Sequence, residues 1–109
     1  MPVASVKEFF EQRLPTRFKE KPELSGKVKG AYKFILQGAD GGTWTVDLSV
    51  PGGKITAADD PAQCTITMTA PDFVDMLNGK LDAQMAFMTG KLKVAGDLGM
   101  ALKLQTFIS

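Results

Sequence analysis

Two runs with a strict period of two constrain the fold of this chain most. In residues 43–50 every second side chain is apolar, and in residues 64–69 Cys64, Ile66 and Met68 alternate with threonines. Successive side chains of a strand point to opposite faces, so this alternation predicts strands with one apolar and one polar side. Both runs therefore belong to a sheet that packs one of its faces on a core.

Turn signals add two further strands to this sheet. Residues 28–36 alternate in the same way, and the Asp-Gly-Gly motif at 40–42 is a hairpin signal that leads into the strand at 43–50. The Pro-Gly-Gly motif at 51–53 marks another turn, after which residues 54–58 predict a short strand. We expect these four strands to form an antiparallel meander.

Before the strands, residues 5–14 predict a helix because their apolar residues recur every three or four positions. Pro15 disfavours helical geometry at Leu14, so we expect a break there, a short turn over residues 15–19 and a loop over residues 20–26. The predicted apolar stripe consists of Val3, Val6, Phe10, Leu14 and Phe18.

After the fourth strand the helical period returns. Thr69 and Asp72 fit a capping box for a short helix ending at 78–79, and Asp82 begins another short helix that Gly90 ends. Residues 91–95 predict a fifth strand, and Asp97 caps a last helix to about residue 108. Helices on one face of a mostly antiparallel five-stranded sheet make an α+β fold. The length of 109 residues fits one domain, 1–109.

The composition argues against several functions. Histidine is absent, which excludes Ser-His-Asp and Cys-His nucleophile systems within this chain. The single cysteine, Cys64, has no partner for an internal disulfide, and we predict neither a metal site nor a cofactor. Capping already explains Asp72, Asp82 and Asp97 at predicted helix starts, so carboxylate catalysis is the weaker interpretation and we predict no enzyme. The 13 basic and 12 acidic side chains argue against nucleic-acid binding.

No segment of the sequence resembles a signal for a membrane or an organelle, so we predict a reducing, cytoplasmic compartment. The first residues lack the apolar run of a signal peptide, and the last three are not the Ser-Lys-Leu peroxisomal signal. No stretch approaches the about 18 apolar residues of a membrane span. One basic cluster fits either a solvated face or weak, transient contact with anionic lipid headgroups. It consists of Lys19, Lys21, Lys27, Lys29 and Lys33.

Soft apolar residues accumulate late in the chain. Four of the six methionines fall after residue 75, and the last predicted helix has a wider apolar arc than packing on a sheet requires. The pattern fits two interpretations equally, a well-packed core with a dimer contact, or a helix with a bound ligand on its second side. The residues concerned are Met76, Met85, Met88, Met100, Phe73, Phe87, Leu98, Leu102, Leu104 and Phe107.

Three segments resemble the sterol carrier protein type 2 family: the Trp-Thr-Val-Asp-Leu run at 44–48, the Pro-Asp-Phe motif at 71–73 and the long run at 79–97. The resemblance implies a five-stranded sheet with helices on one face that encloses a hydrophobic tunnel. It implies an intracellular protein that binds or transfers a fatty acid, fatty acyl-CoA, sterol or phospholipid. The alternative is a non-catalytic accessory or dimerisation module that presents an apolar substrate to a separate enzyme. A second copy of the chain or an enzyme is then the partner.

The resemblance also implies a set of ligand-binding residues. By position, Phe34 corresponds to a wall aromatic, Gln84 to a polar residue near the cavity and Leu102 to a cavity position on the last helix. Some relatives carry glutamine where this chain has Leu102, which predicts a drier tunnel here. The full predicted set is Phe34, Trp44, Ile66, Phe73, Leu77, Gln84, Phe87, Met88, Met100, Leu102 and Phe107.

Overall fold

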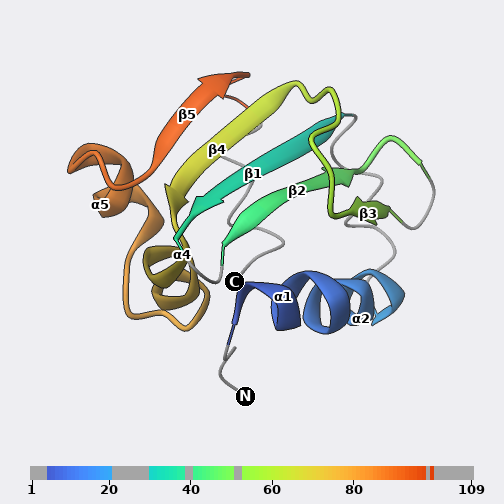
Figure 1. Ribbon diagram of the computed structural model, residues 1–109, viewed down its shortest axis with the longest axis horizontal. Helices are drawn as coiled ribbons and strands as arrows, with labels where there is room; N and C mark the ends of the chain where they lie inside the picture. Colours follow the sequence, from blue (N-terminus) through green and yellow to red (C-terminus); the bar gives the residue numbers. More distant parts are fainter. Residues whose placement is uncertain (1–4, 21–29, 39–40, 51–52, 98, 100–109) are drawn as a thin grey trace.

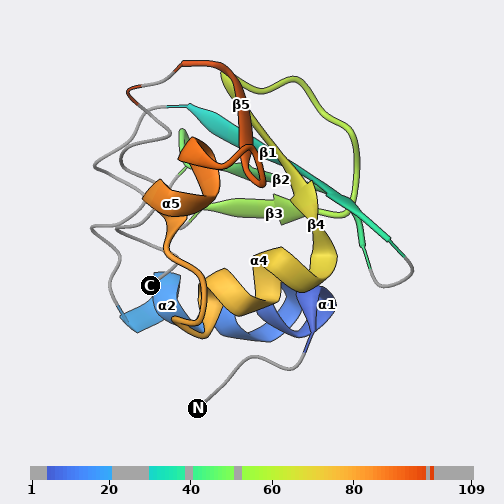
Figure 2. The same cartoon turned by 90° about the vertical axis from the view of Figure 1, so that its left-hand side faces the viewer.

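The computed structural model describes residues 5–20, 30–38, 41–50, 53–97 and 99. These residues form a five-stranded sheet with helices on one of its sides (Figures 1 and 2). The α+β class and the strand count predicted from the sequence are confirmed. In chain order the elements are α1 (Val6–Glu8), η1 (Phe9–Arg13), α2 (Leu14–Glu20), β1 (Ala31–Gln37), β2 (Gly42–Asp47), β3 (Lys54–Thr56), β4 (Cys64–Thr69), α4 (Ala70–Leu77), α5 (Ala83–Met88) and β5 (Lys93–Gly96).

The strand order is β3-β2-β1-β4-β5, and the prediction of a four-stranded antiparallel meander is wrong. β1, β2 and β3 form two hairpins as expected, but β4 pairs with the free edge of β1 and runs parallel to it. The chain reaches that edge through residues 57–63, which cross from β3 to β4 (Figure 1). The other neighbouring pairs are antiparallel, so the sheet is mostly antiparallel as predicted.

Side-chain contacts hold the crossing segment against the outer side of the sheet. Thr45, which is buried, donates a hydrogen bond to the carbonyl of Ala58 at 2.8 Å. Lys33, which lies opposite Thr45 in the strand register, pairs with Asp59 at 2.5 Å. Lys33 therefore has an acidic partner, which weakens its assignment to a lipid-attracting cluster. Of the other four lysines in that cluster, Lys19 is exposed and three lie outside the described residues.

The first helix continues through Pro15, so the predicted break is wrong. A π-helical segment, η1, ends at Arg13, two positions before the proline, and the N–H of Leu14 bonds to the carbonyl of Phe9. This wide turn makes room for the proline ring, which would crowd a preceding carbonyl in a regular α-helix. It also shifts the apolar stripe by one residue, so Phe9 is buried beside the predicted Phe10.

The predicted starts of the later helices are confirmed. The Thr69 side chain accepts from the N–H of Asp72 at the start of α4, and Asp82 accepts from the N–H of Met85 at the start of α5. β5 begins two residues later than predicted. Asp97 accepts a hydrogen bond from the N–H of Gly99, while the rest of the predicted last helix lies outside the described residues.

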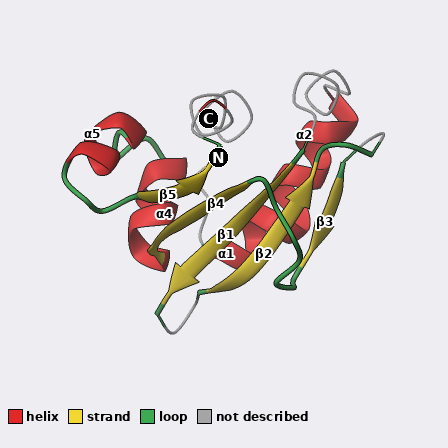
Figure 3. Ribbon diagram, turned by 90° about the horizontal axis from the view of Figure 1, so that it is seen from above, coloured by secondary structure: helices red, strands yellow, loops and turns green. Residues whose placement is uncertain are grey.

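The core lies between the sheet and the helices α1, η1, α2 and α4 (Figures 2 and 3). Every second residue of β1 and of β4 is buried, because alternate side chains of each strand face the helices. The inner face of the sheet is thus the surface on which any internal site must be built.

Candidate functional site

The strand register places a row of four apolar side chains across the inner face of the sheet. Trp44 on β2 lies opposite Phe34 on β1, Phe34 lies opposite Ile66 on β4, and Ile66 lies opposite Val94 on β5. Phe34 and Ile66 are fully buried, whereas Trp44 and Val94 pack against the core from its margins. Three of the predicted ligand-binding residues therefore lie side by side, although their positions in the chain are far apart.

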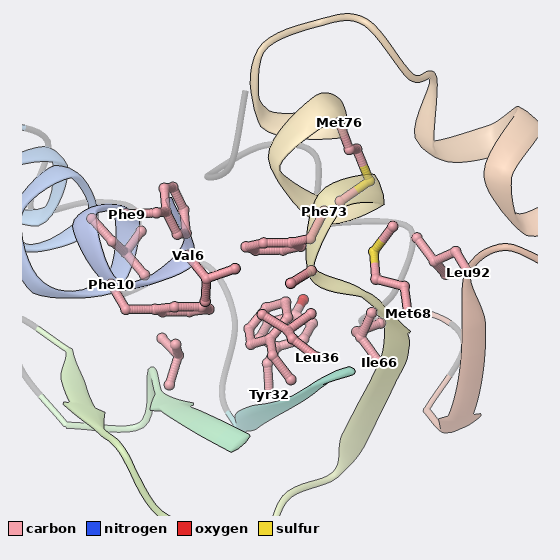
Figure 4. Close-up of a cluster of buried hydrophobic side chains, with 14 of the residues drawn as sticks. Val6, Phe9, Phe10, Tyr32, Leu36, Ile66, Met68, Phe73, Met76 and Leu92 are labelled. Atoms are coloured by element: carbon pink, nitrogen blue, oxygen red, sulfur yellow. The ribbon is translucent and has the colours of Figure 1, made fainter. Parts of the chain in front are cut away.

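An aromatic cluster covers this row from the helical side (Figure 4). Phe10 from η1 stacks on Trp44 with ring centroids 4.9 Å apart and on Phe73 with centroids 5.7 Å apart. Phe73 from α4 also contacts Phe9 at 5.8 Å and Phe34 at 5.6 Å. Phe73 thus connects the N-terminal helices, α4 and the central strand.

Beside the aromatic cluster, soft side chains line the space between α4 and strands β4 and β5. Met68 from β4 and Met76 from α4 present their thioethers there, next to Leu92, which precedes β5 (Figure 4). All three side chains are buried, and Leu77 packs against the same core while partly exposed. Methionine has an unbranched, polarisable side chain, so this part of the wall can adjust its shape more readily than the aromatic part.

The fully buried side chains among the described residues carry no charge at neutral pH. Tyr32 and Cys64 are the ionisable side chains among the buried described residues, and they lie opposite each other in the register of β1 and β4. Burial raises the pKa of Tyr32 far above its usual range. Burial, with a smaller contribution from Asp97, raises the pKa of the Cys64 thiol to about 11. Both groups keep their protons, so Cys64 is a core residue and a poor nucleophile.

Alkaline pH is expected to weaken the fold through Cys64. Its pKa rises from 9.0 to about 11 on folding, so the unfolded chain loses this proton first. The protonated Cys64 therefore makes its full contribution to the free energy of unfolding below about pH 9. This contribution falls by about 1–3 kcal/mol as the pH approaches about 11. Urea unfolding at about pH 8 and about pH 10.5 measures the loss of unfolding free energy between the two pH values. This loss should be smaller for Cys64→Ala, which lacks the thiol, than for the wild type, whereas Tyr32 contributes equally to both proteins. Equal losses would contradict this role for Cys64.

The structure brings together one part of the predicted set and separates another. Phe34, Trp44, Ile66 and Phe73 meet in the row and its aromatic cover, with Leu77 at the margin. Gln84, Phe87 and Met88 are exposed on α5. Met100, Leu102 and Phe107 lie outside the described residues.

Sequence reasoning omitted several residues of this region from the site. Phe10 was placed on the helical stripe, and Tyr32 and Met68 on alternating strands, but none was assigned to the site. Periodicity predicts that all three face inward, but the contacts of Phe10 with Phe34 and Phe73 depend on how η1 and α4 pack on the sheet.

The described residues contain neither a group of side chains that could hold a metal nor a membrane-spanning helix. Among them, no three His, Cys, Asp or Glu side chains gather closely enough to hold a metal ion. Asp82 accepts a backbone hydrogen bond at a helix start, as predicted. Within the same residues no helix has the length and apolar character needed to cross a bilayer.

Comparison with known families gives a match over nearly all of the chain. The family model described as the SCP-2 sterol transfer family matches residues 10–109. Among curated proteins, hydroxysteroid dehydrogenase-like protein 2 of Mus musculus is 42% identical over 89 residues, which are 80% of this chain and 18% of that protein. The protein of the same name from Homo sapiens is 45% identical over 84 residues, 75% of this chain and 20% of that protein. The chain thus spans about a fifth of the length of these relatives.

Solved structures show the same architecture. The solution structure of sterol carrier protein domain 2 of Helicoverpa armigera superposes with a TM-score of 0.77 at 30% identity, covering 93% of this chain and 83% of that one. Palmitated SCP2L2 from Aedes aegypti gives a TM-score of 0.71 at 27% identity and covers 95% of this chain and 94% of that one. Sterol Carrier Protein 2 from Aedes aegypti, in complex with the C16 fatty acid palmitate, gives 0.73 at 25% identity and covers 92% and 91%.

Proposed function

Since the chain belongs to the SCP-2 sterol transfer family, we propose that residues 1–109 act as one domain that holds a fatty acid or a similar lipid. The observation that carries this proposal is the uncharged apolar row of Trp44, Phe34, Ile66 and Val94. The palmitate bound by the two Aedes aegypti relatives supports the ligand class.

In this proposal the ligand lies along the inner face of the sheet, where Phe34 and Ile66 form its floor and Phe73 its aromatic end. The soft side of the face, with Met68 and Met76, accommodates differences in chain length and branching. Burying a 16-carbon chain releases on the order of 13 kcal/mol at about 0.8 kcal/mol per methylene. Losses of ligand freedom offset several kcal/mol of that gain, which leaves an affinity in the roughly micromolar to nanomolar range.

Most of the remaining residues of the predicted set belong to the same proposal. Leu77 borders the ligand, and Gln84 contacts its polar end. The last helix completes the wall. Its proposed wall positions are Met100, Leu102 and Phe107. Phe87 and Met88 of α5 are exposed, so the proposal leaves these two residues out of the wall.

We propose that the chain acts without catalysis of its own and in a reducing, cytoplasmic compartment. The absence of histidine and the raised pKa of the Cys64 thiol support the first statement, because both remove the usual activated nucleophiles. The single cysteine, buried as a free thiol, supports the second.

Native mass spectrometry with added palmitate tests the carrier function. We expect a one-to-one complex with the wild type and at least about tenfold weaker binding by Leu102→Glu, because a carboxylate on the wall opposes burial of an alkyl chain. Lys103→Glu places the same side chain one residue away, on the polar side of the predicted helix, and should bind like the wild type. A wild-type protein that takes up neither palmitate nor a sterol would contradict the carrier proposal.

The size of the curated relatives favours a second candidate function. In hydroxysteroid dehydrogenase-like protein 2 the matched segment is about a fifth of the protein, so this chain resembles one module of a larger protein. The domain would then present an apolar substrate to a separate catalytic domain or enzyme, or assist dimerisation. Copurification with a dehydrogenase, and faster turnover of an apolar substrate when the chain is added back, would favour this candidate.

A further inference from the structure

The large apolar residues of helix α5 lie on its solvent-exposed side and do not pack on the core. Its small residue Ala86 is fully buried, while Met85 is 53%, Phe87 52% and Met88 71% exposed. Within the described part of the chain, these three are the exposed large apolar side chains. A surface helix normally turns such residues towards the core, so this reversed arrangement needs another explanation.

Local hydrogen bonds define both ends of α5 and connect it to β5. The carboxylate of Asp82 accepts from the N–H of Met85 at 3.2 Å, and the hydroxyl of Thr89 donates to the carbonyl of Met85 at 2.8 Å. The N–H of Leu92 donates to the carbonyl of Ala86 at 3.0 Å and connects the helix to the chain entering β5. These bonds make α5 a capped helix that is tied to the chain entering β5, and its buried residue is Ala86.

The three exposed apolar side chains belong to a helix at the margin of the fold. The helix stands at one end of the molecule beside β5, and α2 lies at the opposite end (Figures 1 and 3). A flat partner can approach α5 there without meeting the helices that cover the sheet.

Positive charge borders both ends of the helix. Lys80 precedes α5, Lys91 and Lys93 follow it, and all three lysines are exposed. Asp82 is the one acidic residue in the sequence from 80 to 96, and its carboxylate already accepts a hydrogen bond at the helix start. The segment thus combines exposed apolar side chains with a surplus of cations.

We propose that this segment docks the protein on anionic lipid bilayers. We call it the α5 surface, which consists of Lys80, Met85, Phe87, Met88, Lys91 and Lys93. Apolar side chains that enter the headgroup region and lysines that remain among anionic headgroups are the two contributions that bind interfacial helices to membranes. Docking deepens the proposed function, since a bilayer is the source and acceptor of the lipid, but binding to vesicles can be measured independently of it.

The size of the α5 surface favours a bilayer over a protein partner. Its three apolar side chains expose on the order of 350 Å², against about 800 Å² that each partner buries in a stable protein interface. A bilayer needs no complementary shape, and the lysines add long-range attraction that a small apolar patch lacks. The contact is therefore reversible, as a lipid carrier requires.

Flotation with vesicles tests the apolar half of the α5 surface. The wild-type chain should float with vesicles of phosphatidylcholine and phosphatidylserine, and Met85→Gln/Phe87→Gln/Met88→Gln should bind them about tenfold more weakly. The replaced side chains are exposed, so the thermal midpoint of unfolding should stay near that of the wild type. Wild-type flotation that the triple substitution leaves unchanged would overturn the proposal, as would a wild-type chain that does not float.

A pair of charge variants tests the electrostatic half. Lys91→Gln/Lys93→Gln should lose most of the preference for phosphatidylserine over pure phosphatidylcholine vesicles. Lys7→Gln/Lys19→Gln removes two exposed lysines from α1 and α2 and should keep that preference. If the second pair loses the preference instead, the membrane-facing charge lies on the N-terminal helices and the proposed surface is wrong.

Two further measurements separate the alternatives. Palmitate binding without vesicles reports on the carrier function alone, so a chain that floats but binds no palmitate contradicts the carrier proposal and leaves docking standing. Sedimentation equilibrium reports on self-association. A dimer that the triple substitution dissociates, with unchanged flotation, would assign α5 to a second copy of the chain and overturn docking.

Discussion

Replacing Phe73 by alanine is expected to lower the free energy of unfolding by about 3–5 kcal/mol. Phe73 is fully buried and its ring contacts Phe9, Phe10 and Phe34. The substitution removes the ring that joins the N-terminal helices and α4 to the central strand, and the rigid neighbouring rings cannot collapse into the space. Urea unfolding followed by tryptophan fluorescence measures the effect, because Trp44 stacks on Phe10 in the same cluster.

Phe87→Ala is the matched control, since it makes the same chemical change on another short helix. Phe87 is 52% exposed, so its truncation should change the free energy of unfolding by no more than about 0.5 kcal/mol. A Phe73→Ala protein as stable as Phe87→Ala would contradict the packing described for the aromatic cluster.

Gly96→Ala is expected to cost about 3 kcal/mol or more of stability and to release β5 from the sheet. Gly96 ends β5 with a φ of +94° and lies opposite Cys64 in the strand register. A Cβ atom at this position would overlap the backbone carbonyl of Gln63, which also accepts the hydrogen bond from the N–H of Asp97 at 2.9 Å. The backbone must therefore move, and no side chain can yield in its place.

Gly79→Ala is the control that separates the cost of the Cβ overlap at Gly96 from the cost of a positive φ. Gly79 has a φ of +78°, but a Cβ atom there would meet nothing within 4 Å. Its substitution should cost only about 1–2 kcal/mol, the penalty of a left-handed conformation. Amide hydrogen exchange should show faster exchange in β4 and β5 for Gly96→Ala than for Gly79→Ala, and equal exchange would contradict the close approach at Gly96.

The two stability predictions bear on lipid binding as well. Val94 occupies the β5 end of the apolar row, so a displaced β5 shortens the floor proposed for the ligand. Phe73 packs on Phe34 within the row, so its loss should make room for bulkier ligands when ligand binding stabilises the folded variant. Palmitate should raise the thermal midpoint of both variants by mass action.

Local patterns in the sequence were sufficient to predict the five strands and the starts of α4 and α5. The alternation at Cys64, Ile66 and Met68 places one face of β4 in the core, and burial confirms it. The starts of α4 and α5 were predictable because Thr69 and Asp82 are capping residues whose side chains bond to the backbone three residues later. Such signals act within one turn or one strand, so they can be recognised without knowledge of the fold.

The resemblance of the sequence to a lipid-binding family extended prediction to the site. It placed Phe34, Trp44, Ile66 and Phe73 in one region, and the strand register and ring contacts bring them together. It also assigned Phe87 and Met88 to the same wall, where the structure has them exposed on α5. Periodicity in a six-residue helix cannot tell which side meets the core, because both sides of α5 are apolar.

The sequence alone determined the class of the fold, the inward side of β1, β2, β4 and β5 and the absence of histidine chemistry. These follow from side-chain type and from periods of two and about 3.6 residues. Tertiary structure decided that β4 lies parallel to β1, that the helix passes through Pro15 with a π-helical turn, and that α5 faces outward. Each of these features depends on contacts between segments that are far apart in the sequence. Examples are the contact of Phe10 in η1 with Phe34 and the hydrogen bond from Thr45 to the crossing segment. A local sequence pattern carries no information about such contacts.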